Sequence, residues 1–84
     1  MQSQEKNSQI SEGDIVKTIT DGNYKIILYR YFEGYMCQHI FEYIDLRSER
    51  YFPQDDLKLI ANSSDFDSDQ ERIDYVRVLK QLQK

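Results

Sequence analysis

Hydrophobic and aromatic residues are densest in residues 24–44, which read YKIILYRYFEGYMCQHIFEYI. Two β-prone runs stand on either side of Gly34, and this pattern predicts one long β-hairpin whose turn uses the positive φ that glycine tolerates. In the simplest register, Phe32 lies opposite Tyr35. A one-residue bulge at Gly34 would shift this register and exchange the two faces of the hairpin, and the pattern leaves that alternative open.

Side chains alternate along a strand, so the hairpin has two faces. We expect one face to form the core, and its members are Tyr24, Ile26, Leu28, Phe32, Tyr35, Cys37, Phe41 and Tyr43. The opposite face is expected to be half exposed to water or covered by another element. It comprises Lys25, Ile27, Tyr29, Tyr31, Met36, Gln38, Ile40 and Glu42.

Three further short strands are predicted outside the hairpin, at residues 15–20, 50–52 and 58–60. The Asp21-Gly22 pair is a strong turn signal between the first strand and the hairpin. Pro53 ends the fourth strand, because proline cannot donate a hydrogen bond to a central ladder. The residues that follow it predict a single helical turn before the last strand.

The last segment has the pattern of an amphipathic helix. Ser68 and Glu71 fit the S-x-x-E capping box, so we expect a helix from about residue 69 to residue 83. Its apolar residues recur at i, i+3, i+4 and i+7, and this stripe is predicted to pack on the sheet: Tyr75, Val78, Leu79 and Leu82. Ile73 falls outside the stripe.

Several short motifs accompany this order of elements. They are Gly13-Asp14-Ile15-Val16-Lys17, the Asp21-Gly22 turn, Cys37-Gln38, and Phe52-Pro53 followed by Leu57-Lys58-Leu59-Ile60. Over residues 13–60 the chain resembles the YodC-type small β proteins of bacteria and the wider group of SH3, Tudor and KOW-type barrels. The resemblance implies a binding module and no catalytic residue. The chain departs from it in having no Trp shortly after the Cys, where His39 lies instead.

We therefore predict a mainly β fold, a small five-stranded SH3-like barrel with a C-terminal α-helix. The expected parts are a disordered arm at 1–11, the barrel at 12–60, an acidic linker at 61–67 and the helix at 68–84. A chain of 84 residues has room for one core.

Charge and cysteine content narrow the class of protein. The net charge is −4, which argues against direct nucleic-acid binding and favours a partner with a basic surface. A single cysteine excludes an intramolecular disulfide and fits a reducing compartment. The chain has no apolar run of about 18 residues or more, and it lacks the pattern of a signal peptide at residues 1–11, so we expect a cytoplasmic protein without a membrane span.

Two patterns could carry chemistry, and in both the simpler interpretation is favoured. Cys37 and His39 share a face of one strand, as a thiol and a base would, but buried cysteines are usually inert and no third orienting residue is evident. Asp65, Asp67 and Asp69 have the opening spacing of a calcium loop. That loop would need glycine at its sixth position and glutamate at its twelfth, and neither is present. We expect no enzyme activity, no metal and no cofactor.

The outer hairpin face is the main candidate for function. Tyrosine and methionine are frequent in interfaces, and carboxylates nearby would attract a basic partner. The predicted binding residues are Tyr29, Tyr31, Met36, Ile40, Glu42 and Asp45. The terminal helix could instead cover this face, and the sequence does not decide between the two.

Together these observations predict a small acidic protein-binding module: an adaptor, a subunit, or an inhibitor of the kind that phages encode. In a sharper variant, the module would present carboxylates to a basic, nucleic-acid-binding surface of its partner: Glu42, Asp45, Glu49, Asp55 and Asp56. The simpler interpretation, which we favour, is that these carboxylates keep the surface soluble. The alternative is an RNA- or small-ligand-binding barrel, in which aromatic rings would stack on bases. The oligomeric state is not predicted.

Overall fold

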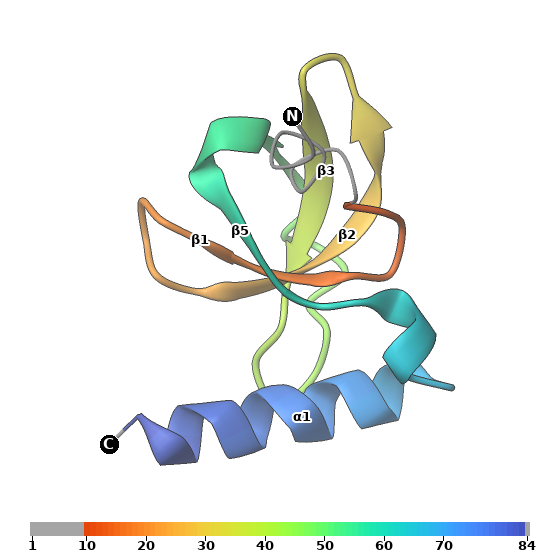
Figure 1. Ribbon diagram of the computed structural model, residues 1–84, viewed down its shortest axis with the longest axis vertical. Helices are drawn as coiled ribbons and strands as arrows, with labels where there is room; N and C mark the ends of the chain where they lie inside the picture. The colour runs from red at the N-terminus through yellow and green to blue at the C-terminus, as the bar shows by residue number, and fades with distance from the viewer. Residues whose placement is uncertain (1–9, 84) are drawn as a thin grey trace, which may run out of the picture.

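The computed structural model describes residues 10–83 as one antiparallel sheet with a C-terminal helix (Figure 1). The strands are β1 (Ile15–Thr18), β2 (Tyr24–Tyr31), β3 (Gly34–His39), β4 (Arg50–Pro53) and β5 (Leu57–Ala61). They pair in the order β4-β3-β2-β1-β5. The mainly β prediction is confirmed, but β4 and β5 do not pair with each other among the described strands, so the sheet is not closed.

Three helical elements complete the described chain. A one-turn 3-10 helix, η2 (Gln54–Asp56), joins β4 to β5 as predicted, and a second, η3 (Ser63–Asp65), follows β5. The α-helix α1 (Asp69–Leu82) begins where the capping box predicted it. The Ser68 hydroxyl accepts a hydrogen bond from the Glu71 amide at 3.3 Å, which satisfies one of the free N–H groups of the first turn. No helix within residues 10–83 is long and apolar enough to cross a membrane.

The predicted hairpin register is wrong, because the turn lies earlier in the chain. Tyr31 pairs with Gly34, which leaves Phe32 and Glu33 as the turn residues. Phe32 takes the positive φ, 52°, a conformation that non-glycine residues rarely adopt. Gly34 is needed for a different reason: a Cβ there would lie 2.3 Å from the backbone oxygen of Phe52.

A register shift between Ile27 and Tyr29 then exchanges the faces of the rest of β2. Ile27 therefore enters the core, and Lys25, predicted on the outer face, is buried. Three residues predicted to be core are exposed instead: Phe32, Phe41 and Tyr43. The physical reason is that Phe32 lies in the turn, while β3 ends at His39 and leaves the other two in the connection to β4.

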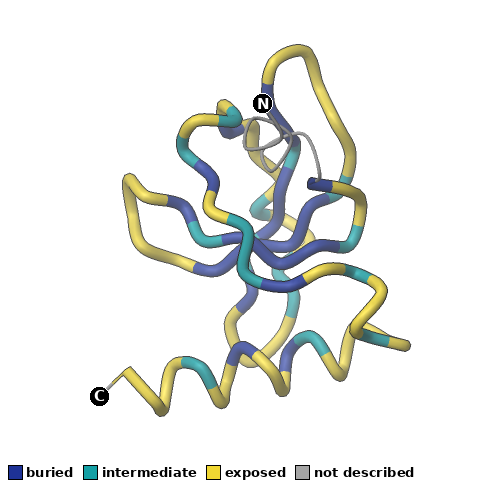
Figure 2. Tube along the Cα trace, viewed as in Figure 1, coloured by how far each residue is buried: buried dark blue, intermediate teal, exposed yellow. Residues whose placement is uncertain are grey.

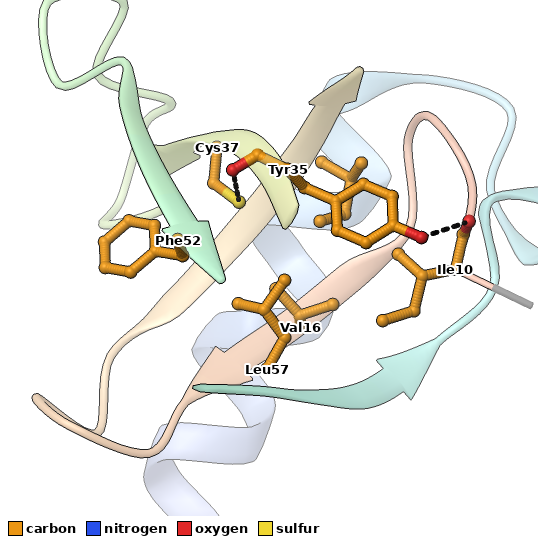
Figure 3. Close-up of a cluster of buried hydrophobic side chains, with 7 residues drawn as sticks. Ile10, Val16, Tyr35, Cys37, Phe52 and Leu57 are labelled. Carbon is orange, nitrogen blue, oxygen red and sulfur yellow. Dashed lines mark hydrogen bonds between the residues drawn. The ribbon is translucent and has the colours of Figure 1, made fainter. Parts of the chain in front are cut away.

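Buried residues are found in every strand of the sheet (Figure 2), and the hydrophobic ones form two separate clusters. The first lies inside the curl of the sheet and is shown in Figure 3; its members are Ile10, Val16, Ile27, Tyr35, Cys37, Phe52 and Leu57. The second lies between the sheet and α1, and comprises Ile15, Tyr24, Ile26, Ile40, Ala61, Ile73 and Val76. Neighbouring residues of β1 thus point to opposite clusters, as the alternation of a strand requires.

Helix α1 packs through a face that shares only Leu79, partly buried against the second cluster, with the predicted stripe. Its buried residues are Ile73 and Val76, whereas Val78 and Leu82 are exposed. A polar contact also holds the buried side of the helix against the sheet, because the Arg72 Nε donates to the Gly13 carbonyl at 2.8 Å. In Figure 1 the helix runs beneath one end of the sheet, and the β3–β4 connection reaches down to it.

The N-terminal boundary also differs from the prediction. Residues 1–9 of the predicted arm lie outside the described residues. Ile10, which was assigned to the arm, is buried in the first cluster, where its carbonyl accepts a hydrogen bond from the Tyr35 hydroxyl at 3.5 Å (Figure 3). The packed part of the chain therefore begins before residue 12.

Candidate binding surface

Three neighbouring strands present aromatic side chains on one face of the sheet. Tyr29 of β2 pairs with Met36 of β3, and Met36 pairs with Tyr51 of β4, so these residues form one row across the strands. Tyr31 lies two residues after Tyr29 on β2, and Phe32 follows it in the hairpin turn, at the end of the sheet away from α1 (Figure 1). We call these five residues the aromatic face.

The aromatic face has four exposed rings, and the Tyr31 ring contacts two of the others. Tyr29, Tyr31, Phe32 and Tyr51 are 41%, 47%, 78% and 39% exposed. The Tyr31 ring contacts Phe32 edge to face with centroids 4.5 Å apart, and it meets Tyr51 in the same geometry at 6.1 Å. Rings fixed in this way lose little conformational freedom when a partner covers them.

Gly34 makes this arrangement possible. A Cβ at Gly34 would lie 2.8 Å from two carbon atoms of the Tyr51 ring, so the ring occupies the space that a side chain would fill. The close approach of β4 to β3 is thus coupled to the position of Tyr51. One small residue on β3 therefore shapes the aromatic face.

Carboxylates lie at two borders of the aromatic face. The Tyr29 hydroxyl donates to the Glu49 carboxylate at 3.1 Å, and this hydrogen bond raises the pKa of the Tyr29 hydroxyl. Beside Tyr51 lies a surface hollow of about 290 Å³, lined by Glu33, Tyr51, Pro53, Gln54 and Asp55. A cation from a partner would meet carboxylates on two sides of the rings.

The nearby arginines belong to the opposite face. The Arg30 guanidinium lies 5.7 Å from the centroid of the Tyr35 ring, and the Arg50 guanidinium lies 5.5 Å from that of Phe52. Both rings are buried in the first cluster. Both guanidinium groups thus lie over the core rings, although the Arg30 Nε also donates to the Phe32 carbonyl at 3.4 Å and Arg50 lines a hollow together with Tyr51.

The structure brings together some of the predicted binding residues and separates the others. Tyr29, Tyr31 and Met36 share the aromatic face. Ile40 is 1% exposed and packs in the second cluster, against α1.

Glu42 lies in the β3–β4 connection beside Arg77 and Lys80 of α1, in a separate hollow. Asp45 lies in the same connection, where its carboxylate accepts a hydrogen bond from the Arg47 amide at 3.0 Å.

Sequence reasoning missed Phe32 and Tyr51 as members of this surface, and it named Glu49 only among the carboxylates that a basic partner could contact. Phe32 had been assigned to the core, and Tyr51 had not been given a face. The pairing of β4 with β3 is the signal that would have found Tyr51, because a strand beside Met36 must place a side chain next to it.

Cys37 and His39 do not form a thiol–imidazole pair. Cys37 is buried, its thiol donates to the Tyr35 carbonyl at 3.7 Å (Figure 3), and burial raises the pKa of the thiol to about 12, although the Lys25 charge opposes the shift. The His39 Nε2 contacts the Lys25 amine at 2.7 Å instead. A thiol with this raised pKa stays protonated near neutral pH, whereas nucleophilic catalysis requires the thiolate.

The aspartates with calcium-like spacing fall in three different local settings. Asp65 ends η3, Asp67 lies in a bend, and Asp69 opens α1. Within residues 10–83, no group of three or more His, Cys, Asp or Glu side chains is placed to hold a metal ion. Asp69 pairs with Arg72 at 3.1 Å.

Comparisons with protein-family models, with curated proteins and with solved structures find no match for this chain. The resemblance to YodC-type and SH3-like proteins therefore rests on its short motifs alone.

Proposed function

We propose that this protein is a non-catalytic protein-binding module and that the aromatic face is its binding surface. The observation that carries the proposal is that α1 covers Ile40 but leaves four aromatic rings exposed at the other end of the sheet. Rigid tyrosines of this kind commonly dominate binding energy in protein interfaces. An adaptor, a subunit or a small inhibitor would each use such a surface.

The fold we propose for this module is an SH3-like barrel. The strand order β4-β3-β2-β1-β5 and the one-turn helix η2 between β4 and β5 support this proposal. The curl of the sheet around the first cluster supports it too. Function does not follow from such a fold, so the aromatic face carries the argument.

We propose that the partner carries basic side chains around an apolar centre. Glu49 at one side of the aromatic face, and Glu33 and Asp55 at the other, favour a cation at each border. The net charge of −4 also attracts a basic partner, over a longer distance than these carboxylates alone. Glu42 and Asp45 lie in the β3–β4 connection, outside the aromatic face, so they are not the main groups that attract the partner.

Binding of RNA, by stacking bases on the same rings, is the alternative. It is disfavoured because Arg30 and Arg50, the cations nearest to the rings in β2 and β4, cover Tyr35 and Phe52 on the opposite face. Phosphates would then meet Glu33 and Glu49 at the border, which is a repulsive arrangement.

The test uses a random peptide library displayed on phage and selected on the immobilised protein, with a labelled single-stranded RNA 12-mer as a second probe. We expect selected peptides to combine Arg or Lys with apolar residues, and to shift the amide signals of β2, β3 and β4 in NMR spectra. Tyr31→Ala and Tyr51→Ala should each weaken binding about fivefold or more, since truncation of an anchor residue costs more than about 1 kcal/mol.

Tyr43→Ala is the matched control, because Tyr43 is an exposed tyrosine in the β3–β4 connection, outside the aromatic face. This variant should keep the wild-type affinity. Peptide binding that maps to α1 or that survives both aromatic-face substitutions would contradict the proposal. Tighter binding of the RNA than of any peptide would favour the alternative.

A further inference from the structure

The buried amine of Lys25 makes an unusual set of contacts at the end of the sheet. Its side chain is 2% exposed, and its Nζ lies 3.3 Å from the Asp21 carboxylate and 2.7 Å from the His39 Nε2. The same atom lies 4.7 Å from the centroid of the Phe52 ring. An ammonium group can only donate hydrogen bonds, so Nε2 must be the acceptor and the ring must be neutral.

His39 also organises the β3–β4 connection, residues 40–49. Its backbone N–H donates to the Ser48 hydroxyl at 2.7 Å, and its carbonyl accepts from the Asp45 amide at 3.0 Å. Its ring stacks on Phe41, with centroids 4.9 Å apart and planes inclined by 7°. The ring therefore joins the Lys25 amine on β2 to the first residues of the connection.

The second ring nitrogen of His39, Nδ1, limits where a further proton can bind. With Nε2 accepting, the neutral ring carries its hydrogen on Nδ1. Nδ1 is buried and has no hydrogen-bond partner among residues 10–83. Nδ1 already carries the hydrogen, so an additional proton can bind only at Nε2, which lies 2.7 Å from the Lys25 amine.

Charged groups face the imidazole from every neighbouring element. Burial lowers the pKa of His39 and the Lys25 ammonium lowers it further, whereas Asp21 in the β1–β2 turn and Asp45 in the connection raise it. Lys80, which reaches from α1 to within 5.7 Å of the Phe41 ring centroid, lowers it as well. The net direction is downward, toward the neutral ring.

We propose that the contact between neutral His39 and Lys25 is a proton-sensitive latch that holds the β3–β4 connection against the sheet. A proton on Nε2 would replace the acceptor by a donor and set two cations 2.7 Å apart. The ring must then turn away from Lys25 and lose its stacking on Phe41. The backbone contacts of His39 with Ser48 and Asp45, which hold the rest of the connection, lose the support of the fixed ring. Because Glu49 ends this connection and binds the Tyr29 hydroxyl, the release extends to the border of the aromatic face.

The chain contains a single histidine, so its titration can be followed without ambiguity. The experiment follows the imidazole signals of the full-length protein by NMR from pH 7.5 to 4.5, and measures amide-exchange protection at each pH. We expect the native His39 to titrate below about 6.5, its ordinary value. Protection of amides in residues 40–49 should fall as it protonates, by about tenfold for each unit of lowered pKa, while that of β1 stays constant.

His39→Gln is the decisive variant, since its amide oxygen can accept from Lys25 and cannot be protonated in this range. It should keep the connection protected down to pH 4.5. Lys25→Met, which removes the opposing cation, should return the His39 titration toward its ordinary value. If this second variant does not fold, the glutamine variant alone decides.

Three results would overturn the latch. One is a native His39 that titrates at or above its ordinary value. Another is a connection whose protection is unchanged across the titration. The third is a glutamine variant that loses protection at the same pH as the wild-type protein.

Discussion

At the scale of single residues, Gly34 couples the packing of two strands to the shape of the aromatic face. Its missing side chain leaves room for the backbone of β4 and for the Tyr51 ring. Gly34→Ala should therefore push β4 away and destabilise the protein by about 1–3 kcal/mol, the usual cost of overpacking. Chemical denaturation followed by circular dichroism measures this. An unchanged midpoint would mean that β4 does not lie against Gly34.

Asp21 gives a second prediction at this scale. Burial alone would raise its pKa, but hydrogen bonds from Thr18 and the Asn23 amide, together with the Lys25 charge, lower it to about 2. Because the native pKa lies below the unfolded value of 3.8, the carboxylate contributes stability that is complete above about pH 4 and is lost as the pH falls toward 2.

Asp21→Asn should remove this contribution. The variant should have a lower melting temperature than the wild-type protein at pH 6, and the difference should shrink between about pH 4 and pH 2. Asp55→Asn, at an exposed carboxylate of η2, serves as the control and should follow the wild-type curve. A difference that persists unchanged at pH 2 would show that Asp21 acts through something other than its charge.

At the scale of elements, α1 carries apolar residues on two sides, and only one side is buried. Val76 is fully buried in the second cluster, whereas Val78, two positions later, is 51% exposed. Val76→Ala should cost about 2 kcal/mol, from two lost methyl groups and the cavity they leave. Val78→Ala should change the free energy of unfolding by less than about 0.5 kcal/mol. Equal effects would mean that the helix packs through the predicted stripe after all.

Elements were predictable where their signals are local. The Ser68 cap, the Asp21-Gly22 turn and the helical turn after Pro53 depend only on neighbouring residues, and all three lie where the sequence placed them. The helix face was predicted correctly only at Leu79, because the buried residues Ile73 and Val76 are no more apolar than the rest of the predicted stripe. Which side packs depends on contacts with distant residues, such as that of Arg72 with Gly13, which the helix pattern alone does not contain.

The candidate site was predicted in part for a physical reason. Near the turn, the true register differs from the simplest one by two positions, and a shift of two keeps every side chain on its face. Tyr29, Tyr31 and Met36 were therefore placed correctly. Beyond the bulge at Leu28 the faces exchange, which is why the burial of Lys25 could not be read from alternation.

At the scale of the whole molecule, the helix and the sheet depend on each other. Removing α1 would expose apolar side chains of the second cluster that belong to the sheet, namely Ile15, Tyr24, Ile26 and Ile40. A chain that ends after residue 66 should therefore melt at a lower temperature and self-associate. Light scattering after size-exclusion chromatography measures the second effect. A truncated chain that stays monomeric and equally stable would show that α1 contributes little to the fold.

The strand order also sets the sequence of events in folding. β2 and β3 are joined by the short turn at Phe32 and Glu33, whereas β1 must find β5, which follows it only after the whole hairpin and β4. Closing a long loop costs more chain entropy than closing a short one, and the cost is met before the contact stabilises anything. The hairpin should thus form early and the β1–β5 pair late. Substitutions in the turn will then slow folding, while those in β5 will mainly speed unfolding.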